Sequence, residues 1–426
     1  MSRPAPSDLP ILPDEVTEDI LVRLDAAADV ARAAIACRSH LRVVRDRRFL
    51  LRLRRSLRPP PVLGFLSTSV RDGPRLRFHR PKAGHGGAAA ARAVARAGDF
   101  AFSFLPRDAA TFTDWSVRDV RDGRVLLSRR RLAGAVNSTF LDLAVADPLH
   151  RRYVLIPTIP DELVLKRYSA EMGSEPFFAV AAAPAAARKE DDDDGGEVVV
   201  VEEEMGSQFH FQVIYNWMSQ YKIDTFVFSS VTGKWRGATS FSLLPSRVIQ
   251  DPRGMARYHV GNCFYWVHNH YDHALVLDEL EMRFSLLALP FPDMMCKKVQ
   301  SQGIAVFDAG EHGLGLIVIR FQVMGLEMYC KKKNDGGGGA EEEWRRHKLI
   351  PYPEPACGFT IVAATEGCLM LEGTTSCSDD SKRSSRYFTL DLKTFLAERW
   401  FIPSAKGIGR PYLYANYPPL LSQPSI

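Results

Sequence analysis

The sequence predicts a mainly β protein with a small all-α part at its N-terminus. Two patterns support this prediction. Between residues 12 and 58, apolar residues recur every three or four positions, which is typical of amphipathic helices. From residue 62 onward, short apolar runs are broken by Gly, Pro, Asp and Asn, which is typical of strands. The run Pro59-Pro60-Pro61 separates the two patterns and marks a domain boundary, because proline cannot continue a helix.

Length and composition set the outer limits. The chain has 426 residues, of which 46% are hydrophobic and 25% charged, so it has room for one large globular domain and a small one. Residues 1–11 are polar and proline-rich, without the pattern of a secretory signal, and we expect them to be disordered. No apolar run is long enough to span a membrane. Seven scattered cysteines without a Cys-x-x-Cys pair indicate reduced thiols, so we expect a cytoplasmic or nuclear protein.

Residues 12 to 24 predict the first helix. Pro13 suits a first helical turn, and the acidic residues that follow it lie at the positive end of the helix dipole. One face of this helix is apolar and consists of Val16, Ile20, Leu21 and Leu24. A second helix is predicted from the spacing of Val30, Ala33, Ala34, Cys37, Leu41 and Val44. Two such helices bury too little surface to be stable alone, so a partner or the rest of the chain must complete them.

In this order, Leu12-Pro13, Ile20, Leu24, Cys37 and Asp46-x-x-Phe49 resemble an F-box motif. The resemblance implies docking onto the Skp adaptor, and through it onto a cullin, in a Skp-cullin-F-box ubiquitin ligase. It implies that the adaptor contacts Leu12, Pro13, Ile20, Leu21, Leu24 and Cys37. Two alternatives stay open. The helices could merely cap the next domain, or the motif could have lost adaptor binding, since His40 replaces its Trp and residues 25–29 lack its second Leu-Pro pair.

A block of arginines without lysine runs from residue 38 to residue 58. Clustered cations can bind nucleic acid by releasing counterions from phosphate. The block has almost no interleaved aromatic residues, however, and its leucines continue the helical pattern. We therefore expect a helix with a solvated basic face and no nucleic-acid partner.

The sequence after residue 61 indicates strands and a repeated unit. Strands are expected at 62–66, 100–104, 125–127, 153–156, 209–214, 225–228, 264–267 and 274–277. Five units, each a polar turn followed by an aromatic residue and an apolar-Pro pair, begin at Asp147, Ser229, Asp278, Leu326 and Asp391. Their spacing of about fifty residues favours a kelch-like or irregular β-propeller over residues 62–415, with a β-sandwich as the alternative. Because one unit would leave bare strand edges, several must close into a ring of unknown blade count.

Five segments, 147–157, 226–235, 264–267, 314–319 and 387–394, resemble the grass-type plant F-box proteins that carry an F-box-associated β-propeller. The resemblance implies a substrate receptor whose propeller binds a target protein for ubiquitination, and it does not identify the target. Such a receptor acts by proximity, so we expect no catalytic residue and no enzymatic activity of the chain itself. Two alternatives remain: a propeller scaffold without adaptor binding, and a propeller enzyme with polar side chains converging in the central channel.

Three inserts, near 82–98, 179–206 and 333–343, are rich in Ala, Gly or acidic residues and are expected to be disordered, and residues 416–426 are expected to form a tail. No insert carries the Gly-Lys-Ser/Thr ending of a phosphate-binding loop, so no cofactor is expected. His268, His270 and His273 are zinc-type ligands within six residues. Because the intervening Asn and Asp are typical of a hairpin turn, we favour a turn and expect no metal.

Overall fold

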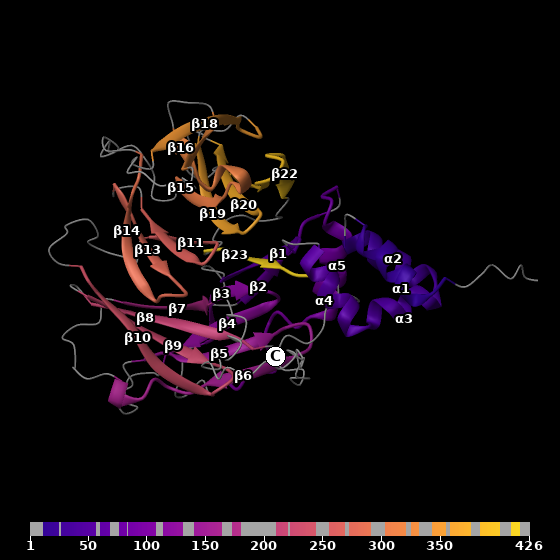
Figure 1. Cartoon of the computed structure of the whole chain (residues 1–426), viewed down its shortest axis with the longest axis horizontal. Coiled ribbons are helices and arrows are strands. Elements are labelled where there is room, and N and C mark those ends of the chain that lie inside the picture. The colour runs from indigo at the N-terminus through magenta and orange to yellow at the C-terminus, as the bar shows by residue number, and fades with distance from the viewer. Residues whose placement is uncertain are drawn as a thin grey trace, which may run out of the picture.

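The computed structural model of this chain describes residues 12–24, 27–56, 60–68, 76–82, 84–107, 114–130, 140–163, 173–179, 210–219, 222–243, 255–268, 272–290, 303–320, 325–331, 343–354, 358–375, 384–400 and 410–417. Within them lie a group of N-terminal helices and a six-bladed β-propeller (Figure 1). The predictions of a mainly β protein and of a propeller are confirmed. The expected disordered N-terminus, 1–11, lies outside the described residues.

The N-terminal region contains four short helices, where two helices and a basic helix within residues 38–58 were predicted. They are α1 (Asp14–Val22), α2 (Ala27–Ala36), α3 (Arg38–Arg45) and α4 (Arg47–Ser56). The predicted second helix is broken at Cys37, and α4 is separated from α3 at Asp46, because both residues adopt an extended backbone. Asp46 also favours a new helix start, since its Oδ1 accepts a hydrogen bond from the Arg48 backbone N–H at 2.7 Å.

The helices share one core with the end of the chain. Its buried residues are Leu21, Ala27, Val30, Ala34, Val43, Val44, Phe49, Leu50, Leu53 and Tyr417. Tyr417 follows the last strand of the propeller, and only 6% of its surface is exposed. The expected tail at 416–426 is therefore corrected at its start: Asn416 and Tyr417 are buried, and residues 418–426 lie outside the described part. The helices are therefore connected to the start of the propeller by the chain and to its end by the packing of Tyr417.

Five blades are four-stranded antiparallel sheets whose strands follow one another in sequence. The first is β3 (Ser116–Arg121), β4 (Arg124–Arg129), β5 (Asp142–Asp147) and β6 (Arg152–Ile156), and the second is β7 (Gly173–Ala179), β8 (Gln212–Met218), β9 (Lys222–Ser229) and β10 (Lys234–Ser242). The third is β11 (Ala256–Val260), β12 (Cys263–Val267), β13 (His273–Asp278) and β14 (Arg283–Ala288). The last two are β15 (Ile304–Asp308), β16 (Leu314–Arg320), β17 (Gly325–Lys331) and β18 (Trp344–Pro351), then β19 (Gly358–Thr365), β20 (Cys368–Thr375), β21 (Ser384–Asp391) and β22 (Ala397–Trp400).

The sixth blade closes the ring with strands from both ends of the propeller. β23 (Tyr412–Ala415) pairs with β1 (Val62–Thr68), which pairs with β2 (Leu76–His79). In the register of this sheet, Phe65 of β1 lies opposite Leu413. β23 also contacts β3 and β19, the innermost strands of the two neighbouring blades. Closure by terminal strands leaves no open gap in the ring, which is how a propeller limits exposed sheet edges.

The five sequence repeats coincide with the five four-stranded blades. Each repeat falls on the hairpin between the third and fourth strands of a blade. In three of these turns, an aspartate carboxylate accepts hydrogen bonds from the backbone N–H groups two and three residues later, at Asp147, Asp278 and Asp391. The residue four positions after each aspartate has a positive φ. The repeated polar residue is thus a turn-forming residue.

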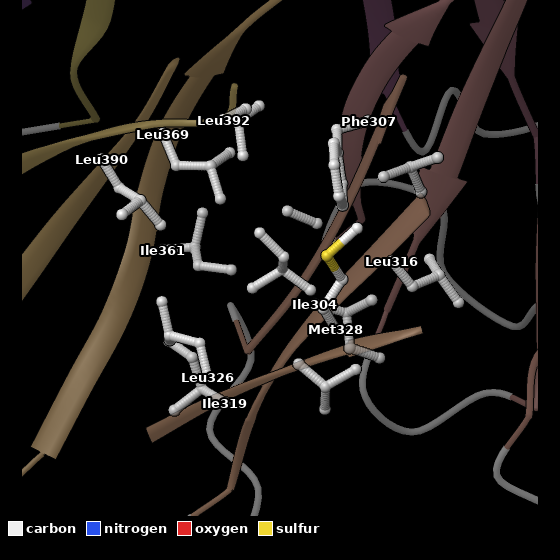
Figure 2. Packing of buried hydrophobic residues seen from close by; sticks show 14 of the residues in the cluster. Ile304, Phe307, Leu316, Ile319, Leu326, Met328, Ile361, Leu369, Leu390 and Leu392 are labelled. Atoms are coloured by element: carbon white, nitrogen blue, oxygen red, sulfur yellow. The ribbon is translucent and has the colours of Figure 1, made fainter. Parts of the chain in front are cut away.

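Packing between blades supplies most of the core. Figure 2 shows leucine and isoleucine side chains from β15, β16 and β17 facing those from β19, β20 and β21. Ile304 and Leu369, from adjacent blades, are both at most 2% exposed. Since a single blade cannot cover its own apolar faces, each blade is stabilised by its neighbours.

Two local predictions are wrong. The insert expected near 82–98 contains helix α5 (Ala88–Ala97), which buries Ala88, Ala91 and Val94 and contacts β1. Alanine has the highest helix propensity, so the Ala-rich run forms a packed helix. Residues 100–104 form turns instead of a strand, because the Asp99 carboxylate accepts hydrogen bonds from the backbone N–H groups of Ala101 and Ser103. The other two inserts lie outside the described residues, apart from buried Ala179 at the end of β7 and exposed Glu343.

Candidate functional site

An exposed apolar stripe, which we call the α1 stripe, consists of Leu12, two residues before α1, and of Val16 and Ile20 on the outer face of the helix. These side chains recur every fourth residue, and their exposed fractions are 52%, 42% and 51%. In Figure 1, α1 lies toward the end of the helical group that is remote from the propeller. A stripe of this kind is available for contact with another molecule.

Contacts on the other side of α1 fix its orientation. Thr17 and Leu21 are buried, and the Thr17 hydroxyl donates to the Pro13 carbonyl oxygen at 3.2 Å. Two arginines of the basic block hold the acidic residues of α1: Arg42 binds Asp14 at 2.6 Å, and Arg52 binds Asp19 at 2.6 Å. These pairs give part of the basic block a structural role within the helical group.

The structure separates the six residues proposed for adaptor contact. Leu12, Pro13 and Ile20 are exposed, whereas Leu24 and Cys37 are partly buried. Leu21 is 3% exposed and packs in the helical core, so it is not available to a partner in this structure. Val16, which belongs to the predicted apolar face, is exposed instead of Leu21.

Cys37 and His40 lie at the junction of α2 and α3. The Cys37 Sγ is 2.8 Å from the Ser39 Oγ, and the His40 Nδ1 is 3.2 Å from the Ala33 carbonyl oxygen. The hydrogen bond with the Ser39 side chain, and then the backbone N–H groups of His40 and Ser39, lower the pKa of Cys37. At the position where the motif has Trp, His40 therefore connects α2 to α3.

A second candidate site lies in the middle of the propeller. A cavity of about 430 Å³ is lined by residues of the innermost strands β3, β11, β19 and β23 and by residues next to them. Its charged lining residues are Asp119, Arg257 and Arg410, and its aromatic ones include Tyr258 and Tyr412. Cavities of roughly 300–1,000 Å³ are typical of sites for small ligands.

Arg257 connects three neighbouring blades beside this cavity. Its guanidinium lies 2.6 Å from a carboxylate oxygen of Glu175 and 3.2 Å from one of Asp119. It also lies over the Phe177 ring at 4.2 Å from the centroid. The second Glu175 oxygen accepts a hydrogen bond from the Trp266 indole at 2.8 Å. These contacts hold the Arg257 side chain in place, so it has a structural role in joining the three blades.

A further polar cluster lies two residues along β3 and β11, where period-two alternation places side chains on the same face. Arg121 is 3.2 Å from Glu366 and 3.4 Å from the His259 Nδ1. The His259 Nε2 is 3.4 Å from a carboxylate oxygen of Glu279, which is buried. Arg121, His259 and Glu366 belong to three alternate blades, so this cluster crosses the central channel at one end.

The histidine cluster does not gather into a metal site in the described residues. His268 lines the central cavity, whereas the His273 Nδ1 binds Asp272 at 2.8 Å. His270 lies outside the described residues. Among residues that the structure places, no three His, Cys, Asp or Glu side chains could hold a metal ion.

No described helix is long and apolar enough to cross a membrane.

The sequence predicted an apolar face on the first helix, of which Val16 and Ile20 are exposed and Leu21 is buried, but it did not predict the residues of the channel. Periodicity identifies Val16 and Ile20 because they are one helical turn apart. No local pattern could relate Arg121 to His259, which are 138 positions apart in the chain. Each becomes a channel residue only when the ring closes.

Comparisons with known proteins do not assign a family. No family model matches the chain, and no curated protein matches it. Similar solved structures include an endo-arabinase from Bacteroides thetaiotaomicron, with 14% identity over 45% of this chain and 77% of that chain and a TM-score of 0.26. Others are the β-propeller domain of the trilobed protease from Pyrococcus furiosus (7% identity, 70% and 72% covered, TM-score 0.32) and an oligogalacturonate lyase in complex with manganese (8%, 80% and 84%, 0.30). Similarities at this level carry no argument about the function of this chain.

Proposed function

We propose that this protein is a substrate-recognition subunit of a Skp-cullin-F-box ubiquitin ligase. In this proposal the helical group docks onto the Skp adaptor, and the propeller binds a target protein. The observation that supports it most is the exposed α1 stripe, which has the position in the chain that the F-box resemblance assigns to adaptor contact.

The energetics of the stripe favour a partner of substantial affinity. Complete burial of a Leu, Val or Ile side chain stabilises by about 1.5–3 kcal/mol, and each of these three is already half buried. Covering the rest of the stripe would contribute about 1 kcal/mol per residue, or about 3 kcal/mol in all. This corresponds to roughly a hundredfold in Kd.

The connection between the helices and the propeller fits a receptor that positions a target. A ligase of this type acts by holding a target lysine close to a ubiquitin-charged enzyme, so the geometry between its two binding surfaces matters. Here Tyr417, at the end of the propeller chain, is packed in the helical core. This shared core would hold the adaptor-binding surface in a fixed relation to the blades.

The direct test is an equilibrium binding measurement between the full chain and purified Skp adaptor. We expect the double variant Leu12→Ala, Ile20→Ala to bind at least about tenfold more weakly than the parent, because it removes most of the stripe. A matched control is the double variant Leu280→Ala, Leu396→Ala, which removes leucines exposed to 66% and 69% on propeller turns. Absence of adaptor binding by the folded parent, or equal loss in both variants, would contradict the proposal.

The polar side chains of the channel are the observation that bears on the two alternatives, a propeller scaffold and a propeller enzyme. Polar side chains do converge there, as the enzyme alternative expects, with Arg257 and His259 on the same innermost strand. Most of these groups are held in ion pairs with each other, which suits a binding surface better than a reactive centre. A protein that has the channel but no adaptor binding would be a propeller scaffold or enzyme.

A further inference from the structure

We infer that the central cavity of the propeller binds an oxyanion, a carboxylate or a phosphate, at the guanidinium of Arg410. This inference goes beyond the proposed function because it involves neither the helices nor an adaptor. It would hold equally for a ligase receptor, a scaffold or an enzyme.

The first step is the position of Arg410. It lies directly before β23, lines the cavity and is exposed to solvent. Its guanidinium carbon lies 5.6 Å from the centroid of the Tyr412 ring, which is also part of the lining. An arginine side chain that rests on an aromatic ring is partly preorganised, so it loses less conformational freedom when it binds a ligand.

The second step is the state of the surrounding charges. Asp119 accepts hydrogen bonds from the backbone N–H groups of Val120 and Phe178 and pairs with Arg257. Glu175 is occupied by Arg257 and the Trp266 indole. Within the described part of the chain, Arg410 forms no ion pair with either carboxylate. Among the charged side chains that line the cavity in the described residues, Arg410 is thus the one whose N–H donors are available to a ligand.

The segment that precedes Arg410 has no carboxylate that could pair with its guanidinium. Residues 401–409, which precede Arg410, contain no Asp or Glu. Partial desolvation at the cavity wall alone would lower the pKa of Arg410, but electrostatic interactions with Tyr412, Glu175, Tyr258 and Asp119 outweigh it and raise the pKa. The guanidinium therefore stays charged, and its planar array of N–H donors matches the oxygens of a carboxylate or a phosphate.

The cavity also limits the size of the ligand. A volume of about 430 Å³ suits one side chain or a small organic molecule. The oxyanion can come from two sources, namely an acidic or phosphorylated side chain of a bound target, or a free small molecule. Both would place the oxyanion on Arg410 and the remaining atoms against Tyr412 and the apolar lining residue Val362.

The test uses the full chain and three variants. Arg410→Gln removes the charge, and Arg410→Lys keeps the charge but loses the planar donor array. The matched control Arg236→Gln removes an exposed arginine from β10 in another blade. The urea midpoint of each variant, followed by tryptophan fluorescence, shows whether the fold is kept.

Two sets of probes distinguish the sources of the oxyanion. Sodium phosphate and sodium succinate, titrated at constant ionic strength in a calorimeter, represent a free ligand. Blocked pentapeptide pools with random flanks and a central Glu, phosphoserine or Gln represent a target side chain, and peptides retained by the immobilised protein are identified by mass spectrometry.

We expect the parent to bind at least one oxyanion probe, with about tenfold weaker binding for Arg410→Gln, an intermediate effect for Arg410→Lys and none for Arg236→Gln. Retention of acidic pools alone would identify a target side chain as the source, and binding of phosphate or succinate alone would identify a free ligand. If the parent binds none of the probes, or if Arg410→Gln binds them as the parent does, the inference is wrong.

Discussion

Replacing Tyr417 by Ala should separate the stability of the helical group from that of the propeller. The Tyr417 side chain is 6% exposed and packs in the core that includes Leu21, Val44 and Phe49. Truncating a buried aromatic side chain to Ala costs about 3–5 kcal/mol. The helices span only residues 14–56, and a domain of this size has little stability to lose, so we expect them to unfold first.

The chain provides separate probes for its two parts. All six tryptophans lie after residue 114, in propeller segments, so their fluorescence reports on the blades. Circular dichroism at 222 nm reports mainly on the helices. In urea titrations of Tyr417→Ala, we expect the signal at 222 nm to change at a lower urea concentration than the fluorescence, by about 1–3 M for a loss of this size.

The control is Tyr153→Ala, which removes a tyrosine that is 40% exposed on the outer strand β6. It should leave both transitions close to those of the parent. If neither signal of Tyr417→Ala moves, the helices do not depend on Tyr417. The reasoning about a shared core would then be refuted.

Three further predictions concern the closing blade and the helices. Burial, and to a smaller extent Arg77, lower the pKa of His79 below its ordinary 6.5. The unfolded chain therefore binds the proton more readily than the folded one, and stability falls as the pH drops below 6.5. Between pH 7.5 and 5.5, the free energy of unfolding should decrease less in His79→Gln than in the parent. Gly123→Ala should lower the thermal midpoint more than Gly233→Ala: both glycines have positive φ, but only at Gly123 would a Cβ meet a side chain, at 2.2 Å from Asn416. Arg42→Ala should leave the urea midpoint close to that of the parent, because its pair with Asp14 is solvent-exposed.

Sequence patterns were sufficient for features that depend on local periodicity. The repeats locate the outer hairpins because four of the five turns use the same chemistry, an aspartate or serine followed four residues later by a positive φ, as at Asp278 and Met282. The exposed face of α1 follows from helical spacing in the same way. Such features need only a few consecutive residues, so the sequence alone is informative.

Other features depend on contacts that no short segment contains. Helix α5 has the composition of a low-complexity loop, and it is stabilised because Ala91 and Val94 pack in a core with Leu63 and Leu66 of β1. The pairing of β1 with β23 joins residues about 350 positions apart. The channel residues Arg121 and His259 meet for the same reason, through closure of the ring.

The most direct test of the proposed function is hydrogen–deuterium exchange of the full chain, alone and with an excess of Skp adaptor. We expect slower exchange on adaptor binding in residues 12–24, where the α1 stripe lies, and unchanged exchange in the blades. We expect less protection of these residues in the Leu12→Ala, Ile20→Ala variant at the same adaptor concentration. Protection confined to the propeller, or no protection at a concentration that saturates known F-box proteins, would contradict the proposed function.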